Sequence, residues 1–304
     1  MRALILGGSG IIAHALVQAA PAGAQLLLGW HVQQPVLPAV ALRQCDLTDA
    51  GAVVRLLRET RPDVVIDAAG MSGVDACEKD PAAARASNVT ATANLLAALR
   101  EYPAKLIYVS TNAVYDGKRA PYHEESPQEP VNVYGRMKKE CEDLVRAAAP
   151  AGWAIARLIL VLGWSPPWSR LNPLPWMVQT LRAGKPLSLV NDVFENPLPA
   201  PFAATVLWQL ATTDFSGELN VAGGEIVNRY ELGRQVAAAF GLNAALLRPV
   251  PSSFFPAIAP RPANTAYDTA KLRQLPGLTP PPLAAALAAL QRQDGKHGFS
   301  VSVR

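Results

Sequence analysis

The sequence predicts an α/β protein with a doubly wound parallel sheet, and three observations carry that prediction. Short apolar runs alternate with longer helical patterns through the first half of the chain. A glycine-rich turn joins the first apolar run to the first helix, and beyond residue 160 proline becomes frequent and the apolar runs shorten. Because such alternation gives parallel strands joined by right-handed crossovers, we expect a sheet domain over residues 1–160. A smaller α/β domain is expected over 161–304, with a return of the chain to the sheet left open.

The glycine-rich turn spans residues 7–13 and follows the apolar run 2–6. Gly7 and Gly10 permit backbone torsions and close approaches that a Cβ would prevent. The helix beginning at Ile11 then points its free N–H groups at whatever lies above the turn, which suits a pyrophosphate. The spacing is Gly-x-x-Gly-x-x-Ala rather than Gly-x-Gly-x-x-Gly, so a purely structural turn is the alternative. This Rossmann-type arrangement makes 1–160 a candidate NAD(P)-binding domain.

The other elements follow in order. Helices are expected at 11–19, up to residue 60, at 81–100, 171–182, 229–240 and 282–291, and strands at 24–28, 40–45, 63–67, 105–109, 154–162, 187–190 and 219–221. Thr48 or Asp49 would cap the helix that ends at residue 60, and Asp80 the long helix 81–100. Since ligands bind at the carboxyl ends of parallel strands, the residues that end these strands should share one rim.

The end of the second strand bears on the cofactor. Nicotinamide-dependent enzymes often place an acid there to hold the adenosine ribose, but the sequence has His31 and no acid before Asp46. Nothing nearby would repel a 2′-phosphate, which favours NADP, with NAD as the alternative. After the fourth strand, Ala68, Ala69 and Gly70 are small enough for the cofactor to lie across the strand end, unless they form a simple tight turn.

Composition excludes several classes of function. The net charge is +4 with no block of like charge, so nothing indicates nucleic acid. No apolar run approaches the ~18–20 residues of a membrane span, and the first run is too short for a signal peptide. We therefore expect a cytoplasmic protein. Cys45, Cys77 and Cys141 lie far apart without metal-ligand spacing, so we expect free thiols and no metal site.

Two later segments carry residues suited to acid–base chemistry. Ser110 and Thr111 follow the fifth strand, and Tyr134 and Lys138 lie on one face of a predicted helix. A phenol with a pKa of about 10 exchanges protons poorly at neutral pH, and a nearby ammonium would lower that pKa. The pair suits interconversion of a carbonyl and an alcohol, with Thr111, or its competitor Ser110, holding the substrate oxygen. The alternative is a solvated helix face.

The order of these motifs resembles the extended short-chain dehydrogenase/reductase superfamily. Within it, the chain is most similar to the dTDP-4-dehydrorhamnose reductase branch, which includes the regulatory beta subunit of methionine adenosyltransferase. The matching stretches are residues 7–13, 62–69, 74–78, 110–117, 121–125, 132–138, 217–223 and 261–264, with Asn88, Glu142, Asp268 and Leu272. The resemblance therefore covers almost the whole chain.

The resemblance implies roles for individual residues. The cofactor would be contacted by Gly7, Gly10, Ile11 and Ile12 at the pyrophosphate, by Asp46 and Leu47 at the adenine, by Ala68, Ala69 and Gly70 at the ribose, and also by His31, Tyr134 and Lys138. Thr111, Tyr134 and Lys138 would form the catalytic triad. Asn112, Arg261 and Asn264 are candidates for substrate binding, although Arg261 could simply anchor a loop.

Several positions depart from the branch. Asn112 stands where the branch usually has Asp, and residues 196–202 lack its Arg-x-Pro-Thr-x-x-x-x-Asp pattern. These changes bear on a sugar-nucleotide substrate more than on the cofactor. A set of aromatic residues indicates either a more apolar pocket or a well-filled core, namely Trp164, Trp168, Trp176 and Phe194.

The resemblance implies an NAD(P)H-dependent reductase of a keto group, with a 4-keto nucleotide sugar as the default substrate and Tyr134 as the proton donor. Residues 161–304 would then bind the substrate. Within the enzyme class, the alternative is an epimerase or dehydratase acting on a nucleotide sugar. Outside it, the alternative is a non-catalytic NADP-binding regulatory subunit. A homodimer is common in the superfamily, but the sequence carries no signature of one.

Overall fold

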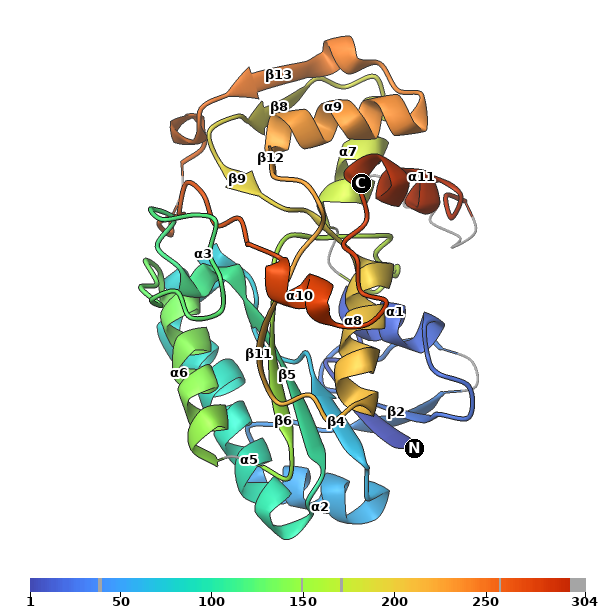
Figure 1. Cartoon of the computed structure of the whole chain (residues 1–304), viewed down its shortest axis with the longest axis vertical. Helices are drawn as coiled ribbons and strands as arrows, with labels where there is room; N and C mark the ends of the chain where they lie inside the picture. Colours follow the sequence, from blue (N-terminus) through green and yellow to red (C-terminus); the bar gives the residue numbers. More distant parts are fainter. Residues whose placement is uncertain (38–39, 149, 170–171, 257, 296–304) are drawn as a thin grey trace.

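A seven-stranded parallel sheet forms the centre of the computed structural model, which describes residues 1–37, 40–148, 150–169, 172–256 and 258–295 (Figure 1). The strands run in the order β11-β6-β5-β4-β1-β2-β3. They are β1 (Arg2–Leu6), β2 (Gln25–Trp30), β3 (Ala41–Gln44), β4 (Val64–Asp67), β5 (Lys105–Thr111), β6 (Trp153–Leu158) and β11 (Gly217–Val221). Every neighbouring pair is parallel, which confirms the predicted doubly wound fold.

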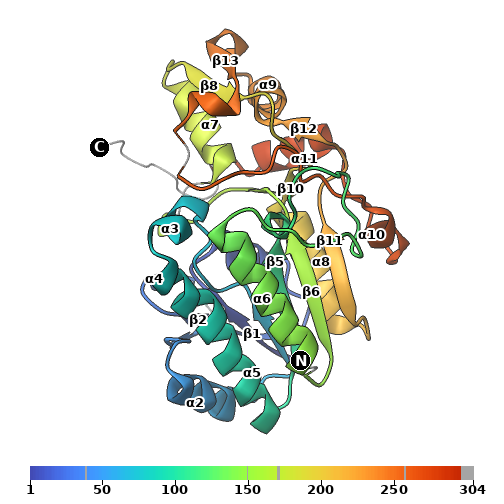
Figure 2. The same ribbon diagram turned by 90° about the vertical axis from the view of Figure 1, so that its left-hand side faces the viewer.

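Helices cover both faces of this sheet (Figure 2). One face carries α2 (Ala50–Thr60), α5 (Ala91–Glu101) and α6 (Val133–Ala148), and the other carries α1 (Ile11–Gln18) and α8 (Ala200–Thr212). The path into α5 runs through α3 (Val74–Lys79), α4 (Pro81–Arg85) and the π-helical stretch η1 (Ala86–Thr90). Because apolar side chains are buried on both faces, β1 and β4 are almost continuous apolar runs.

Most predicted helices begin at or near the residue expected from the sequence. Tertiary packing explains where the observed helices differ from the predicted ones. Asp80 caps α4 as predicted, its carboxylate accepting the Ala83 N–H at 2.9 Å. Asp49 rather than Thr48 caps α2. The predicted helix 81–100 is interrupted by the π-helical stretch η1. No predicted element corresponds to α8. Most of its residues are buried, so it lacks the polar stripe that reveals a surface helix.

The segments after β6 build a smaller lobe beside the sheet (Figure 1). Its two-stranded sheets are β7 (Val161–Leu162) with β10 (Leu198–Pro199), β8 (Leu187–Val190) with β13 (Leu247–Val250), and β9 (Phe194–Glu195) with β12 (Val227–Asn228). Its helices are α7 (Pro173–Arg182), α9 (Arg229–Phe240) and α11 (Leu283–Gln291), with the short elements η3 (Ala244–Leu246) and η4 (Ser252–Phe254). Two other short elements belong to the large sheet: η2 (Asn112–Val114) directly follows β5, and α10 (Ala270–Gln274) packs on β11. Between β10 and β12 the chain returns to the large sheet as α8 and β11.

Four further details complete the comparison with the sequence-based predictions. The predicted strand 154–162 is divided into β6 and β7. Leu171, with which the predicted helix 171–182 begins, lies outside the described residues. Cys45, Cys77 and Cys141 are buried free thiols. Among the described helices, none is long and apolar enough to cross a bilayer.

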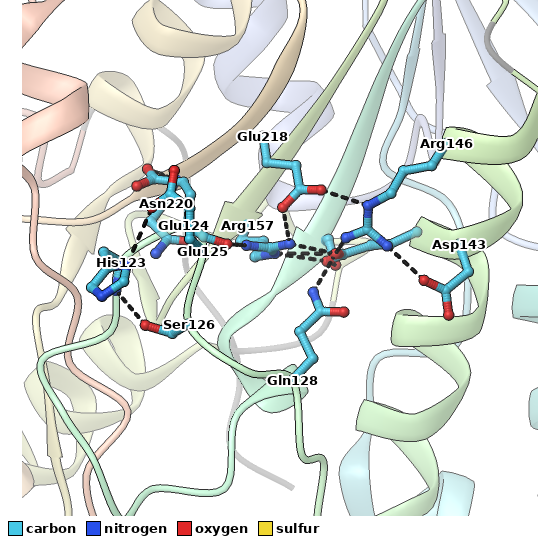
Figure 3. A network of polar contacts seen from close by, with 12 residues as sticks. His123, Glu124, Glu125, Ser126, Gln128, Asp143, Arg146, Arg157, Glu218 and Asn220 are labelled. Carbon is cyan, nitrogen blue, oxygen red and sulfur yellow. Dashed lines mark hydrogen bonds and ion pairs between the residues drawn. The ribbon is translucent and has the colours of Figure 1, made fainter.

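A buried ionic network fastens α6 to the edge of the large sheet (Figure 3). Arg157 on β6, only 1 % exposed, donates to both carboxylate oxygens of Glu142 on α6 at 2.8–3.1 Å. The same guanidinium donates to the Tyr115 hydroxyl at 2.9 Å and pairs with Glu218 on β11. Glu142 also accepts the Ser110 hydroxyl of β5 at 2.5 Å. One carboxylate therefore connects α6 with β5 and β6, and Arg157 extends the connection to β11.

We predict that Glu142→Gln lowers the free energy of unfolding by about 3 kcal/mol, because it leaves the Arg157 charge buried without its main counter-ion. Urea denaturation measures this loss. Asp143→Asn is the matched control, since Asp143 lies next to Glu142 on α6 but is half exposed in its pair with Arg146; it should change stability by about 0.5 kcal/mol or less. Equal effects of the two variants would contradict the central place given to Glu142.

Candidate active site

A cleft of about 1400 Å³ lies between the carboxyl ends of the strands and the smaller lobe. Ligands of doubly wound sheets bind at this edge. Most of the predicted site residues line it: Gly7, Gly10, Ile11, Ile12, Ala68, Ala69, Gly70, Thr111, Asn112, Tyr134, Lys138 and Arg261. The structure thus brings together in one cleft the glycine-rich turn and the predicted catalytic residues.

The glycine-rich turn has the geometry of a pyrophosphate cradle. Gly7 has a φ of +79°, and a Cβ there would lie 2.5 Å from the Ala68 carbonyl oxygen. Gly10 occupies the N-cap of α1 and, having no side chain, makes no capping hydrogen bond. The first N–H groups of α1 therefore keep their donor capacity at the cleft, where an anionic oxygen is favoured. These residues fit a dinucleotide cofactor.

The adenosine end differs from the sequence-based expectation. His31, Asp46 and Leu47 do not line the cleft. Although no acid is near His31 in the sequence, the end of β3 brings one close in space: Asp46 Oδ2 lies 3.6 Å from His31 Nε2. The prediction that no acid lies near the end of β2 was therefore wrong. Neighbouring parallel strands end side by side, so Asp46 after β3 comes close to His31 after β2. Both side chains are exposed, so this pair lies at the surface, outside the cleft lining.

The catalytic candidates come from two adjacent elements. Thr111 ends β5, and its Oγ1 accepts the Ala113 N–H at 3.2 Å, while Tyr134 and Lys138 lie one turn apart at the start of α6. Thr111 and its competitor Ser110 both line the cleft. The Ser110 hydroxyl, however, is committed to Glu142. The Thr111 hydroxyl donates to the neutral Asn112 Oδ1 at 3.2 Å, a weaker bond than one to a carboxylate. Thr111 is thus the hydroxyl that a substrate oxygen can recruit more easily.

The electrostatics of Tyr134 differ from what its spacing with Lys138 predicted. Lys138 Nζ donates to the Tyr108 hydroxyl at 2.6 Å and to the Val109 carbonyl at 2.7 Å, both on β5. Burial raises the pKa of Tyr134 to about 12, and a hydrogen bond with Thr111 opposes this only in part. The predicted lowering of that pKa was therefore wrong, because the Lys138 ammonium is engaged by β5 and desolvation outweighs the opposing effects.

Two groups beside Lys138 were missed by the sequence analysis. Tyr108 is its hydrogen-bond partner, and Asp67, 4 % exposed at the end of β4, lies near enough to raise the pKa of Lys138 against the lowering effect of burial. Burial in turn raises the pKa of Asp67. An acid that ends a buried apolar strand was the available signal, since such a group is rarely buried without a partner.

The predicted substrate residues are placed differently from one another. Asn112 faces the cleft and donates to Glu195 Oε1 at 3.1 Å and to Thr265 Oγ1 at 2.6 Å. Arg261 lines the cleft, but its Nη2 lies 2.7 Å from Asp75 Oδ2. This ion pair matches the alternative that Arg261 anchors a loop. Asn264 does not line the cleft, and its Oδ1 accepts the Ala266 N–H at 3.1 Å.

The aromatic residues divide between cleft and core. Trp168 and Trp176 line the cleft. Trp164 is buried in the smaller lobe and donates to the Leu290 carbonyl, and Phe194 is outside the cleft lining. The predicted apolar pocket therefore applies to Trp168 and Trp176, and the predicted well-filled core applies to Trp164. Asn196, one of the departures from the branch, is buried and hydrogen-bonds to the backbone of Tyr267.

The strand order, the glycine-rich turn and the grouping of Thr111, Tyr134 and Lys138 define an NAD(P)-dependent oxidoreductase of the extended short-chain dehydrogenase/reductase class. More narrowly, the chain belongs to the RmlD substrate binding domain family, whose sequence profile matches residues 1–294.

The chain is similar to several known proteins. A probable low-salt glycan biosynthesis reductase of Haloferax volcanii is 31% identical, over 96% of this chain and 97% of its own length. The dTDP-4-dehydrorhamnose reductase of Mycobacterium tuberculosis is 32% identical over 95% and 93%. The methionine adenosyltransferase 2 subunit beta of Pongo abelii is 30% identical over 76% and 70%. The crystal structure of a dTDP-4-dehydrorhamnose reductase from Bacillus anthracis in complex with NADP superposes with a TM-score of 0.83 at 22% identity, covering 96% and 99%.

We predict that Gly7→Ala weakens NADPH binding by about tenfold or more, because the added Cβ collides with the Ala68 backbone beneath the cradle. Fluorescence titration with NADPH gives the Kd. Gly184→Ala is the matched control: its φ is also positive, at +66°, but nothing lies within 4 Å of its Cβ. That variant should lose some stability and keep the wild-type Kd. Unchanged NADPH binding by Gly7→Ala would refute the cradle.

A second prediction concerns pH. Since the pKa of Tyr134 is raised to about 12, its phenol should stay protonated from neutral pH to about pH 10, where an ordinary tyrosine is half ionised. Subtracting the ultraviolet pH titration of Tyr134→Phe from that of the wild type isolates its tyrosinate absorbance. We expect no Tyr134 tyrosinate below about pH 10. Ionisation near neutral pH would contradict the dominance of burial at this position.

Proposed function

We propose that the chain is an NADPH-dependent reductase that converts the keto group of a nucleotide-linked sugar to an alcohol, with dTDP-4-dehydrorhamnose as the default substrate. The observation that carries this proposal is the single cleft shared by the glycine-rich cradle and by Thr111, Tyr134 and Lys138. The names of the Haloferax and Mycobacterium relatives support a sugar-directed reductase.

The residues divide the work of carbonyl reduction. NADPH bound over the cradle would supply the hydride. Thr111 would turn its hydroxyl from Asn112 Oδ1 to the keto oxygen and stabilise the charge that develops there. Tyr134 would deliver the proton to that oxygen. Its raised pKa keeps the proton on the phenol until it is needed. Lys138, fixed by Tyr108 and Val109, would carry the positive charge beside the nicotinamide ribose.

In this proposal the smaller lobe binds the sugar nucleotide. It closes the cleft opposite the cradle with side chains from α7, β9 and α9, among them Trp176, Glu195 and Arg229. The substrate side proposed for residues 161–304 is then made by the described part of this range except α8 and β11, which belong to the large sheet. NADP is favoured over NAD by the NADP complex of the Bacillus anthracis structure.

The proposal predicts that purified protein oxidises NADPH when given dTDP-4-dehydrorhamnose and forms the 4-hydroxy sugar. Tyr134→Phe should lower kcat by about a hundredfold to a thousandfold, because it removes the proton donor, while the Kd for NADPH stays at the wild-type value. Tyr102→Phe makes the same chemical change outside the cleft lining and should leave kcat unchanged. NADPH absorbance gives the rate, and nuclear magnetic resonance identifies the sugar product.

Other outcomes of this assay point to the alternatives. A changed sugar without net consumption of NADPH would indicate an epimerase or dehydratase. NADPH binding without turnover of any keto sugar, together with a stable complex with another protein, would indicate a regulatory subunit. The regulatory-subunit alternative is supported by the 30% identity to the methionine adenosyltransferase 2 subunit beta.

A further inference from the structure

A polar cluster from both parts of the molecule lies in the cleft next to Thr111. Asn112 joins it from the end of β5, Glu195 from β9 and Arg229 from the start of α9. The Thr111 hydroxyl donates to Asn112 Oδ1 at 3.2 Å, and Asn112 Nδ2 donates to Glu195 Oε1 at 3.1 Å. Arg229 Nη2 lies 2.7 Å from Glu195 Oε2. A continuous chain of polar contacts thus runs from the proposed keto-oxygen site to Arg229.

One end of this chain has unused hydrogen-bonding capacity. Arg229 Nη1 is buried and has no hydrogen-bond acceptor among the residues that the structure describes. A guanidinium carries its donors in a fixed fork, so the pairing of Nη2 with Glu195 also fixes the direction of Nη1. An unpaired buried donor of a charged group is costly, and Arg229 lines the cleft. The cluster is therefore prepared for an oxygen acceptor supplied by a ligand.

The charge of the cluster decides which kind of oxygen fits. Arg229 and Glu195 neutralise one another, and their side chains are only 27% and 15% exposed. A phosphate that approached Arg229 would also approach the Glu195 carboxylate, which repels it. A hydroxyl both donates and accepts, so it can take the free N–H of Arg229 and donate to the carboxylate of Glu195. A donor beside an acceptor, with no net charge, matches a neutral alcohol.

We propose that Arg229 and Glu195 recognise a hydroxyl of the same sugar ring whose keto oxygen is held by Thr111, an inference that rests on the proposed function. Asn112 lies between the two sites: it follows Thr111 in the chain and donates to Glu195 Oε1 at 3.1 Å. Arg229 and Glu195 are then substrate-binding residues that select the hydroxylated sugar, and they take no part in the proton transfer.

Calorimetric titration of the NADP⁺-saturated protein with dTDP-rhamnose and with dTDP tests this proposal, since dTDP has the phosphates but no rhamnose ring. Arg229→Gln should weaken dTDP-rhamnose binding by about tenfold, the size expected for one lost polar contact, and leave dTDP binding unchanged. Arg234→Gln, the same change at an exposed position of α9, should bind both ligands as the wild type does. If Arg229→Gln weakens the binding of both ligands equally, Arg229 contacts the phosphates and the proposal is overturned. If it weakens the binding of neither, Arg229 and Glu195 have only a structural role, and the proposal is again overturned.

Arg229→Lys guards against a folding defect, because it keeps a positive partner for Glu195 but loses the forked donors. It should retain the wild-type denaturation midpoint and still weaken dTDP-rhamnose selectively. Failure of the proposed function has a separate signature. If the wild-type protein itself binds neither dTDP-rhamnose nor dTDP, the sugar-nucleotide assignment fails and this inference falls with it. If the wild type binds both and Arg229→Lys behaves identically, only the inference is overturned.

Discussion

The ion pair between Arg157 and Glu142 is the constraint on which the proposed catalytic geometry depends. Tyr134 and Lys138 belong to α6, whereas Thr111 belongs to β5, so their mutual position is fixed only as well as the helix is fixed to the sheet. Glu142 binds both Arg157 of β6 and Ser110 of β5. Removing two charges from water is costly, and this cost is met here by several hydrogen bonds to each group. A displaced α6 would separate Glu142 from Arg157 and Ser110 and leave these buried groups with fewer partners, which makes small shifts of the helix unfavourable.

Burial has opposite effects on the two titratable residues of the site, and both effects favour the neutral form. It raises the pKa of Tyr134 and lowers that of Lys138. For Lys138, the nearby Asp67 works against burial and helps the ammonium to persist. For Tyr134, no comparable counter-charge contributes, so the phenol remains an acid. That division suits a site where one residue must give up a proton and the other must supply a constant charge.

The sequence predicted those parts of the site that short segments encode. The turn at Gly7 and the pair formed by Tyr134 and Lys138 are local patterns, and the cleft contains both. Contacts between distant segments were beyond reach: Asp46 beside His31 depends on the order of the strands, and Arg229 meets Glu195 only because α9 and β9 fold onto one another. The pKa of Tyr134 was misjudged for the same reason, since spacing along a helix carries no information on desolvation or on competing partners such as Tyr108.

The substitution at residue 112 becomes understandable once the smaller lobe is in place. One amide nitrogen of Asn112 donates to both Glu195 and Thr265, and a carboxylate at this position could donate to neither. It would also place a second negative charge 3.1 Å from Glu195 Oε1, where like charges repel. Asn112 therefore supplies the donor that the Glu195 carboxylate needs, and Arg229 supplies its counter-charge. A pocket that had only lost its substrate residues would not be expected to keep such matched donors and acceptors, which weighs toward a reductase with a particular sugar substrate and against a silent scaffold.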